Sequence, residues 1–306
     1  MGNVLYVLTG PTAVGKTELA LQWAEENGAE IVSCDSLLVY KGMDIGTAKP
    51  TREELGRIPH HCIDIVPVNK RFSVKNYEQV AHEAIESILS RGKNVLITGG
   101  SGFYLKCFFS PIADAVDVPE AIVHEVLELY HKEGLAGLVE ALRERNPSGT
   151  GKVELKNPRR VIRALEKCMT TGQEITAMEE AFAGQTSPFD KFEKRVCMLT
   201  RSQESLKERV RSRVKQMLQA GLLPEVARLK DQGILDNYSA ARSIGYRESL
   251  SYLEEPTSLQ DLEDLITQNT MQLVKKQKTW FKYQIKVDHT IDLDIEKCPD
   301  LDQLFG

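Results

Sequence analysis

A short segment near the start of the chain has the residue types and spacing needed to hold phosphate groups. Gly10–Thr17 reads GPTAVGKT and satisfies the pattern G-x-x-x-x-G-K-[ST]. Glycines let the backbone wrap an anion with its N–H groups pointing inward, and a helix that begins there adds partial positive charge. Lys16 adds a full charge, and the Thr17 hydroxyl can reach Mg²⁺. The predicted phosphate-binding residues are Gly10, Pro11, Thr12, Ala13, Val14, Gly15, Lys16 and Thr17.

The loop alone leaves open whether ATP, another nucleotide or a bare diphosphate binds there. The neighbouring loops narrow the choice. Asp35 follows an apolar run in VSCDSLLVY. The carboxyl ends of parallel strands face the ligand crevice, so we expect Asp35 on the same side as the phosphate loop. That position suits a general base or a metal ligand, although a strand-end Asp-Ser pair also commonly caps a turn. Two further glycine-bearing polar loops, Lys41–Pro50 and Thr98–Tyr104, favour a binding site at this edge.

The elements that must position these loops alternate between strand and helix. Apolar runs and helical spacing predict strands at Val4–Thr9, Glu30–Ser33, Asn94–Thr98 and Val196–Thr200, and helices at Lys16–Glu26 and Tyr77–Ser90. This alternation is typical of a parallel α/β sheet, here a P-loop NTPase-like core. Residues 119–178 show helical periodicity broken by Gly134, a turn-rich stretch at 146–151 and Gly172. We therefore expect a first core part at 1–110, a helical insertion at 111–190, core completion with C-terminal helices at 191–287, and an acidic tail at 288–306.

Composition excludes several classes of protein. The 306 residues are 42% apolar and 27% charged, as in ordinary globular chains, and not as in disordered or collagen-like ones. The net charge of −5 is matched by a local excess of acids in residues 288–306, so basic patches have to be sought locally. The six dispersed cysteines, the absence of a signal-peptide pattern and the lack of a long apolar run favour a cytoplasmic protein outside the membrane. The oligomeric state stays open, and a monomer is compatible with the sequence.

Basic residues cluster at three places after residue 150. Lys275, Lys278, Lys282 and Lys286 follow one another at spacings of three, four and four, which predicts one basic stripe on a helix. A second cluster contains Lys156, Arg159, Arg160 and Arg163. The third, Arg201–Lys215, is interpreted as a solvated helix face. A solvated face is also the alternative for the lysine stripe, because charge patterns of this kind are nonspecific.

Seven segments in order resemble one known family. They are GPTAVGKT, DSLLVYKGMDIGTAKP, PHHCIDI, TGGSGFYLK, NPRRVIRALE, IGYRE and KKQKTWFK, and they extend from about Val4 to Lys282. Together they closely resemble the bacterial tRNA dimethylallyltransferases, also called isopentenyl-tRNA transferases. The phosphate loop is shared with many enzymes, whereas GTAKP and Lys-Gln-x-Thr-Trp are far more specific. The resemblance implies transfer of a dimethylallyl group from dimethylallyl diphosphate to the exocyclic amine of the adenine 3′ of the anticodon, with Mg²⁺ as cofactor and tRNA as partner.

The same resemblance assigns roles to individual residues. Asp35 becomes the candidate base, with Lys16 and Thr17 at the diphosphate and Thr12, Ser36 and Arg247 as further candidates. Leu38 stands where many members have Gln, and Ser101 and Lys282 stand where Thr and Arg are frequent. The implied tRNA contacts are Asp35, Ser36, Leu37, Leu38, Ser101, Pro158, Arg159, Arg160, Val161, Ile162, Arg163, Arg242, Ser243, Ile244, Gly245, Tyr246, Arg247, Lys275, Lys276, Gln277, Lys278, Thr279, Trp280, Phe281 and Lys282.

Two functions of other classes compete with this interpretation. A small-molecule kinase, acting on a nucleoside or a metabolite, would use the same loop for ATP and would need no RNA. A noncatalytic, nucleotide-dependent RNA-binding module would need no carboxylate beside the loop. The lysines between Lys275 and Lys286 argue against the kinase, and Asp35 argues against the module.

Overall fold

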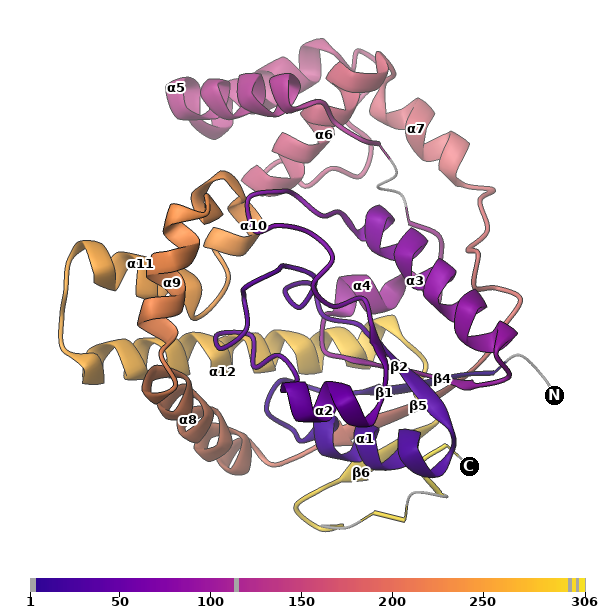
Figure 1. Cartoon of the computed structure of the whole chain (residues 1–306). Helices are drawn as coiled ribbons and strands as arrows, with labels where there is room; N and C mark the ends of the chain where they lie inside the picture. Colours follow the sequence, from indigo (N-terminus) through magenta and orange to yellow (C-terminus); the bar gives the residue numbers. More distant parts are fainter. Residues whose placement is uncertain (1–3, 113–115, 297–298, 301–302, 306) are drawn as a thin grey trace. The chain divides into compact units, whose positions relative to one another are not determined.

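The chain divides into two compact units. The computed structural model describes residues 4–112, 116–296, 299–300 and 303–305 (Figure 1). Unit 1 comprises Met1–Ser110 and Pro188–Gly306, and unit 2 comprises Pro111–Ser187. Unit 2 begins at the residue where the insertion was expected to begin, and it ends at Ser187 where the sequence suggested 190.

A parallel sheet forms the centre of unit 1. Among the described residues it has six strands in the order β3-β2-β4-β1-β5-β6. The strands are β1 (Val4–Thr9), β2 (Ala29–Ser33), β3 (His60–His61), β4 (Asn94–Gly99), β5 (Glu193–Thr200) and β6 (His289–Asp292). In the central strand, Thr9 pairs with Gly99 on one side and with Met198 on the other. The loops after β1, β4 and β5 therefore leave the sheet side by side.

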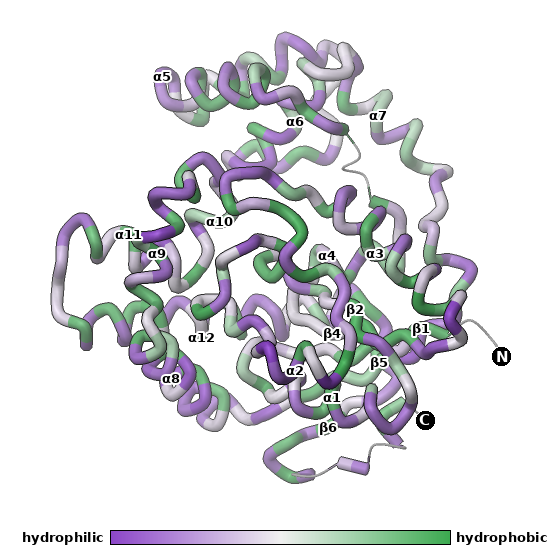
Figure 2. Tube along the Cα trace, in the orientation of Figure 1, coloured by the Kyte–Doolittle hydropathy of each residue, from purple (hydrophilic) through white to green (hydrophobic). Residues whose placement is uncertain are grey.

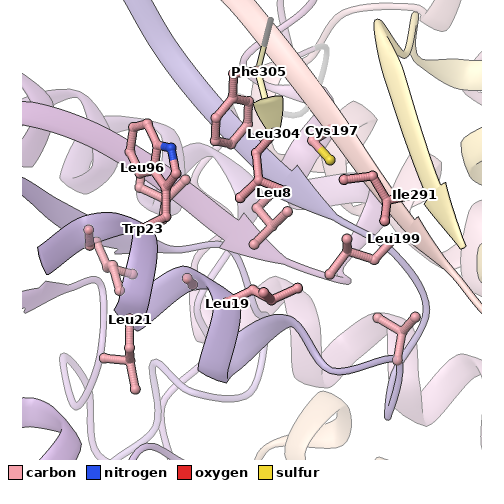
Figure 3. Packing of buried hydrophobic residues seen from close by; sticks show 14 of the residues in the cluster. Leu8, Leu19, Leu21, Trp23, Leu96, Cys197, Leu199, Ile291, Leu304 and Phe305 are labelled. Atoms are coloured by element: carbon pink, nitrogen blue, oxygen red, sulfur yellow. The ribbon is translucent and has the colours of Figure 1, made fainter. Parts of the chain in front are cut away.

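The helices of unit 1 pack on the sheet or on one another. They are α1 (Lys16–Glu26), α2 (Arg52–Arg57), α3 (Val74–Ser90), α4 (Gly102–Lys106), α8 (Gln203–Gln219), α9 (Leu222–Asp231), the 3₁₀ helix Ile234–Asp236, α10 (Tyr238–Ala241), α11 (Tyr246–Glu254) and α12 (Leu259–Gln284). Leu19 and Trp23 of α1 pack with Leu8, Leu96 and Leu199 of the strands (Figure 3). Burying each such side chain contributes about 1.5–3 kcal/mol. By contrast, α8 is mostly hydrophilic (Figure 2).

The end of the chain is part of this core, which corrects the expectation of an acidic tail at 288–306. Strand β6 pairs with β5, and the Phe305 ring lies 4.9 Å from that of Trp23. The aspartates of this segment accept backbone hydrogen bonds: Asp288 Oδ2 from Val196 N–H at 2.9 Å, and Asp294 Oδ2 from Ser202 N–H at 2.8 Å. These two carboxylates therefore help to hold β6 and its flanking residues against β5.

Unit 2 has a helical core of its own. Its helices are α5 (Glu120–Glu144), α6 (Pro158–Thr171) and α7 (Ile175–Phe182), which bury Leu138, Leu142 and Leu165. Gly134 interrupts α5 with φ 67°, as the broken periodicity predicts. Asn146 joins the elements because its amide donates to Leu142 O at 2.6 Å while its Oδ1 accepts from Ile175 N–H at 2.7 Å.

None of the helices that the structure describes combines the length and the apolarity needed to cross a lipid bilayer.

Candidate active site

A cavity of about 520 Å³ lies in unit 1 where the strands end. Its lining comes from the loops after β1, β2 and β4 and from helices α8 and α12. Among the lining residues are Lys16, Thr17, Asp35, Gly100, Arg213 and Gln277. The structure thus brings the three predicted catalytic residues, Lys16, Thr17 and Asp35, into one cavity at the carboxyl edge of a parallel sheet, where ligands of such folds bind.

The phosphate loop is shaped by two glycines with positive φ. At Gly10, φ is 146° and an added Cβ would lie 2.5 Å from the carbonyl oxygen of Leu199. Gly15 has φ 118° and is the N-cap of α1. A side chain at Gly10 would push β5 away, and one at Gly15 would be strained in any case. The loop therefore ends at the N-terminus of α1, where backbone N–H groups favour an anion.

The Lys16 amine has hydrogen-bond partners in the phosphate loop and a lowered pKa. Its Nζ donates to Gly10 O and to Pro11 O, each at 2.9 Å. Burial, and to a smaller extent the nearby Arg213, lower the pKa of Lys16 from 10.5 to about 8, and Asp35 opposes both effects. A phosphate placed beside this amine would favour its charged form.

Asp35 closes a turn and also lines the cavity. Its Oδ1 accepts the Leu37 N–H at 2.9 Å, which closes a turn. The residue also lines the cavity with Lys16 and Arg213. Next to it, Ser36 N–H donates to Ser101 Oγ at 3.0 Å, so the loop after β2 is joined to the loop after β4. The turn fixes the carboxylate without removing it from the cavity.

Two arginines of the third basic cluster contact the phosphate loop and a third lines the cavity, so the interpretation of this cluster as a solvated face was wrong. Arg209 Nε donates to Ala13 O at 2.7 Å, and Arg201 Nε donates to Val14 O at 2.9 Å. Arg213 donates to Thr47 O at 3.1 Å and lines the cavity. Burial lowers the pKa of Arg213, and Asp35 opposes this shift. The signal available in the sequence was the spacing of four between Arg209 and Arg213 after a strand.

A buried carboxylate fixes the loop that carries Thr47. Glu225 of α9 accepts backbone N–H groups from Asp44, Ile45 and Gly46 at 2.8 to 3.1 Å. It also accepts the Tyr246 hydroxyl at 2.6 Å. The Tyr246 ring lies so close to Gly46 that an added Cβ would be 2.6 Å away. The GTAKP segment thus owes its shape to α9 and α11.

One turn of α12 holds the ends of three strands in place. Gln277 Oε1 accepts Thr12 N–H and its Nε2 donates to Gly100 O, both at 2.9 Å. Lys278 Nζ donates to Arg201 O at 3.0 Å. The Trp280 ring lies where a side chain at Gly102 would be, 2.5 Å from the ideal Cβ. These residues were expected at tRNA, and in the structure their polar and aromatic groups contact the segments that follow β1, β4 and β5.

Several other predicted tRNA contacts need correction. The side chains of Val161, Tyr246 and Phe281 are buried in their cores, so they cannot reach a ligand on the surface. Helix α12 ends at Gln284, so Lys286 lies beyond it and does not continue the helical stripe. Arg247 was also a candidate for the diphosphate site, but it pairs with Glu248 at 2.6 Å and is not among the residues that line the cavity. The predicted basic contacts that are exposed are Arg159, Arg160, Arg242, Arg247, Lys275, Lys276 and Lys282.

The residues that line the cavity could hold Mg²⁺ only together with oxygens of a bound ligand. Within the described residues, no cluster of three or more His, Cys, Asp or Glu side chains could hold a metal ion. Thr17 and Asp35 both line the cavity. Mg²⁺ commonly takes one or two protein oxygens and completes its shell with phosphate oxygens and water. A hydroxyl and a carboxylate beside a phosphate loop match that donor set.

A strand, a phosphate loop and a helix at the centre of a parallel sheet, with a lysine and a carboxylate facing one cavity, define a P-loop α/β enzyme. The family model described as IPP transferase matches residues 38–284. The chain belongs to this family, a family of prenyltransferases. It is 49% identical to the tRNA dimethylallyltransferase of Opitutus terrae, over 94% of this chain and 92% of that protein.

The chain is also similar to solved structures of transferases that act on tRNA. The tRNA isopentenylpyrophosphate transferase of Staphylococcus epidermidis matches with a TM-score of 0.67 and 32% identity, over 99% of this chain and 96% of that one. The enzyme of the same name from Bacillus halodurans matches with a TM-score of 0.66 and 33% identity, over 95% and 90%. A eukaryotic dimethylallyltransferase acting on tRNA matches with a TM-score of 0.75 and 26% identity, over 99% and 75%. The P-loop NTPase-like fold expected from the sequence is thereby confirmed.

Proposed function

We propose that this chain transfers the dimethylallyl group of dimethylallyl diphosphate to the exocyclic amine of the adenine 3′ of the anticodon in tRNA. The observation that supports this most is the cavity in which Asp35 faces Lys16 and Arg213. It offers a base for the amine and cations for the diphosphate in one space. Family membership adds to this support, because relatives in Opitutus terrae and Exiguobacterium are tRNA dimethylallyltransferases.

Asp35 would act on the nucleophile. The lone pair of an adenine amine is delocalised into the ring, so the amine attacks well only if a proton is removed as the new bond forms. In this step a C–N bond forms between the amine and the allylic carbon, and the amine proton passes to Asp35. The turn through Leu37 N–H holds one carboxylate oxygen at 2.9 Å and so orients the group.

The phosphate loop would act on the leaving group. As the allylic C–O bond breaks, negative charge accumulates on the diphosphate, and fixed N–H groups and cations stabilise it. Lys16 and Arg213 line this part of the cavity. Mg²⁺, held by Thr17 and phosphate oxygens, would supply further positive charge to the leaving group.

The adenine has to leave its stack to reach a carbon inside the cavity, as enzymes that modify bases generally require. The exposed lysines of α12, Lys275, Lys276 and Lys282, would bind phosphates of the RNA. A cytoplasmic location is part of this proposal, and the free, buried thiols Cys34, Cys62, Cys107, Cys168 and Cys197 support it.

A transfer assay separates this function from the kinase alternative. The protein is offered dimethylallyl diphosphate with tRNA, and separately ATP with small acceptors, both with Mg²⁺. We expect dimethylallylated adenosine in the digested tRNA and no phosphoryl transfer from ATP. Lys16→Met serves as the matched loss-of-charge control. Phosphoryl transfer to a small acceptor, without prenylation of tRNA, would overturn the proposal.

A further inference from the structure

Aromatic side chains are exposed on helices α4 and α12 of unit 1. Phe103 is 58% exposed and Tyr283 is 68% exposed, although both have large aromatic side chains. Trp280, which precedes Tyr283 on α12, is partly exposed. Large exposed aromatic groups that gather in one place typically mark a surface that binds something.

Contacts at both ends of α4 bring its surface next to that of α12. At its start, the Trp280 ring lies against Gly102, 2.5 Å from where a Cβ would be. At its end, Lys106 Nζ donates to Gln284 Oε1 at 3.3 Å. Phe103 follows Gly102 directly, and Tyr283 precedes Gln284 directly. The two helices lie side by side (Figure 1), so Phe103 and Tyr283 are carried by neighbouring helices.

The charge around these rings is positive. Neither Gly102–Ser110 nor residues 275–287 contain an acidic residue, and they contribute Lys106, Lys275, Lys276 and Lys282 among others. The Lys282 ammonium lies 5.2 Å from the centre of the Tyr283 ring. Aromatic rings among lysines are typical of surfaces that hold single-stranded nucleic acid, because bases stack on the rings and phosphates pair with the cations.

This surface adjoins the cavity. Gly100, two residues before Gly102, lines it, and so does Gln277, one turn before Trp280. A nucleotide whose base enters the cavity would therefore place its unpaired neighbours near Phe103 and Tyr283. Single-stranded loops are recognised mainly through bases that are splayed out and stacked on aromatic side chains.

We propose that Phe103 and Tyr283 form a base-stacking surface for the unpaired nucleotides that flank the target adenine. This inference rests on the proposed function, since it takes RNA as the partner. Stacking needs no counterion release, so its contribution to binding is independent of salt, in contrast to that of the lysines. This difference provides the test.

The experiment measures the Kd of the full chain for an anticodon stem-loop RNA over a range of salt concentrations. Phe103→Ala and Tyr283→Ala are each expected to weaken binding about 5- to 100-fold, without changing the slope of log Kd against log salt. Phe103→Trp should keep the affinity. Ile295→Ala is the matched control, because Ile295 is 84% exposed and apolar but follows β6 and belongs to neither helix.

A second readout reports stacking directly. 2-Aminopurine placed next to the target adenine should be quenched in the complex with the unchanged chain and should regain fluorescence with Phe103→Ala or Tyr283→Ala. Unchanged affinity and fluorescence in both variants would overturn the proposal. A changed salt slope would assign the loss to displaced lysines and would overturn it as well. Since these measurements need no prenyl transfer, their outcome is independent of the transfer assay for the proposed function.

Discussion

The side-chain amide of Gln277 joins the phosphate loop to the loop after β4. Its Oε1 accepts the Thr12 N–H at 2.9 Å, and its Nε2 donates to Gly100 O at 2.9 Å. An added Cβ at position 100 would lie 2.8 Å from Nε2, so a side chain there would displace the amide. A helix from the last third of the chain therefore fixes a loop from its first twenty residues.

Replacing Gln277 by Ala should weaken diphosphate binding about 3- to 10-fold, because each lost hydrogen bond contributes about 0.5–1.5 kcal/mol to the shape of the loop. Gln277→Glu should bind diphosphate worse than Gln277→Ala, since it adds a negative charge near Lys16. Titration calorimetry with inorganic diphosphate and Mg²⁺ measures both. Gln272→Ala, an exposed change on the same helix, should have no effect. Equal affinities for all four proteins would contradict the role of Gln277.

Asp35→Asn should lower the single-turnover rate of transfer about 10²- to 10⁴-fold, because it removes the proton acceptor and keeps the shape. The asparagine oxygen can still accept the Leu37 N–H, so the affinity for tRNA should change little. Rapid-quench measurements at saturating tRNA give the rate. Asp231→Asn, at an exposed position at the end of α9, should behave like the unchanged chain. A near-normal rate for Asp35→Asn would remove Asp35 from the mechanism.

Diphosphate binding to the free protein should weaken as pH rises through about 8. The pKa of Lys16 is lowered to about 8, so the amine is charged below this pH and becomes neutral above it. The unfolded chain keeps its lysine protonated up to about 10.5, so between these values the same group makes the folded state more stable as pH rises. Binding is measured from pH 6.5 to 9.5 for the unchanged chain and for Lys16→Met. The difference between them cancels the ionisation of the ligand itself, and a difference that does not vary with pH would refute the assignment.

The lysines of α12 should contribute unequally to the salt dependence of tRNA binding. Lys275, Lys276 and Lys282 are exposed, whereas Lys278 is partly buried and donates to Arg201 O. Each exposed lysine that contacts a phosphate should add about 0.7–0.9 to the slope of log affinity against log salt. Ala substitution of the three exposed lysines should flatten the slope by up to about 2 to 3 units. Lys278→Ala alone should leave it nearly unchanged. An unaltered slope in the triple variant would show that these lysines form a solvated face and do not contact phosphates.

Tyr246→Phe should destabilise unit 1 by about 1–3 kcal/mol, because the buried Glu225 loses one of its donors. The loop Lys41–Pro50 keeps its three backbone hydrogen bonds to Glu225, so the fold should survive. Urea unfolding followed by circular dichroism gives the change. Tyr252→Phe on the same helix is the control, and a loss of equal size in the two variants would argue against the role of the hydroxyl.

The sequence predicts the elements that are marked by a pattern of consecutive residues, and it misses contacts between residues that are far apart in the chain. The strand Val4–Thr9 and the helix Lys16–Glu26 are found within the predicted bounds, because each is a continuous pattern closed by glycines. Strands β3 and β6 were missed: one has only His60 and His61, and the other lies among aspartates. Arg209 and Arg213 were missed because an arginine that donates to a distant loop looks, in sequence, like one in water. Val161 and Phe281 were placed at RNA by their motifs, whereas packing buries them.

The closing strand of the sheet also sets the order in which the site can be completed during synthesis. Arg201 holds Val14 O of the phosphate loop and is itself held by Asp294, which follows β6. Phe305 packs on Trp23 of α1. The segment that carries Asp294 and Phe305 leaves the ribosome after every other strand of the sheet. A nascent chain therefore carries an incompletely braced phosphate loop until this segment has left the ribosome, and it gains full affinity for diphosphate only then.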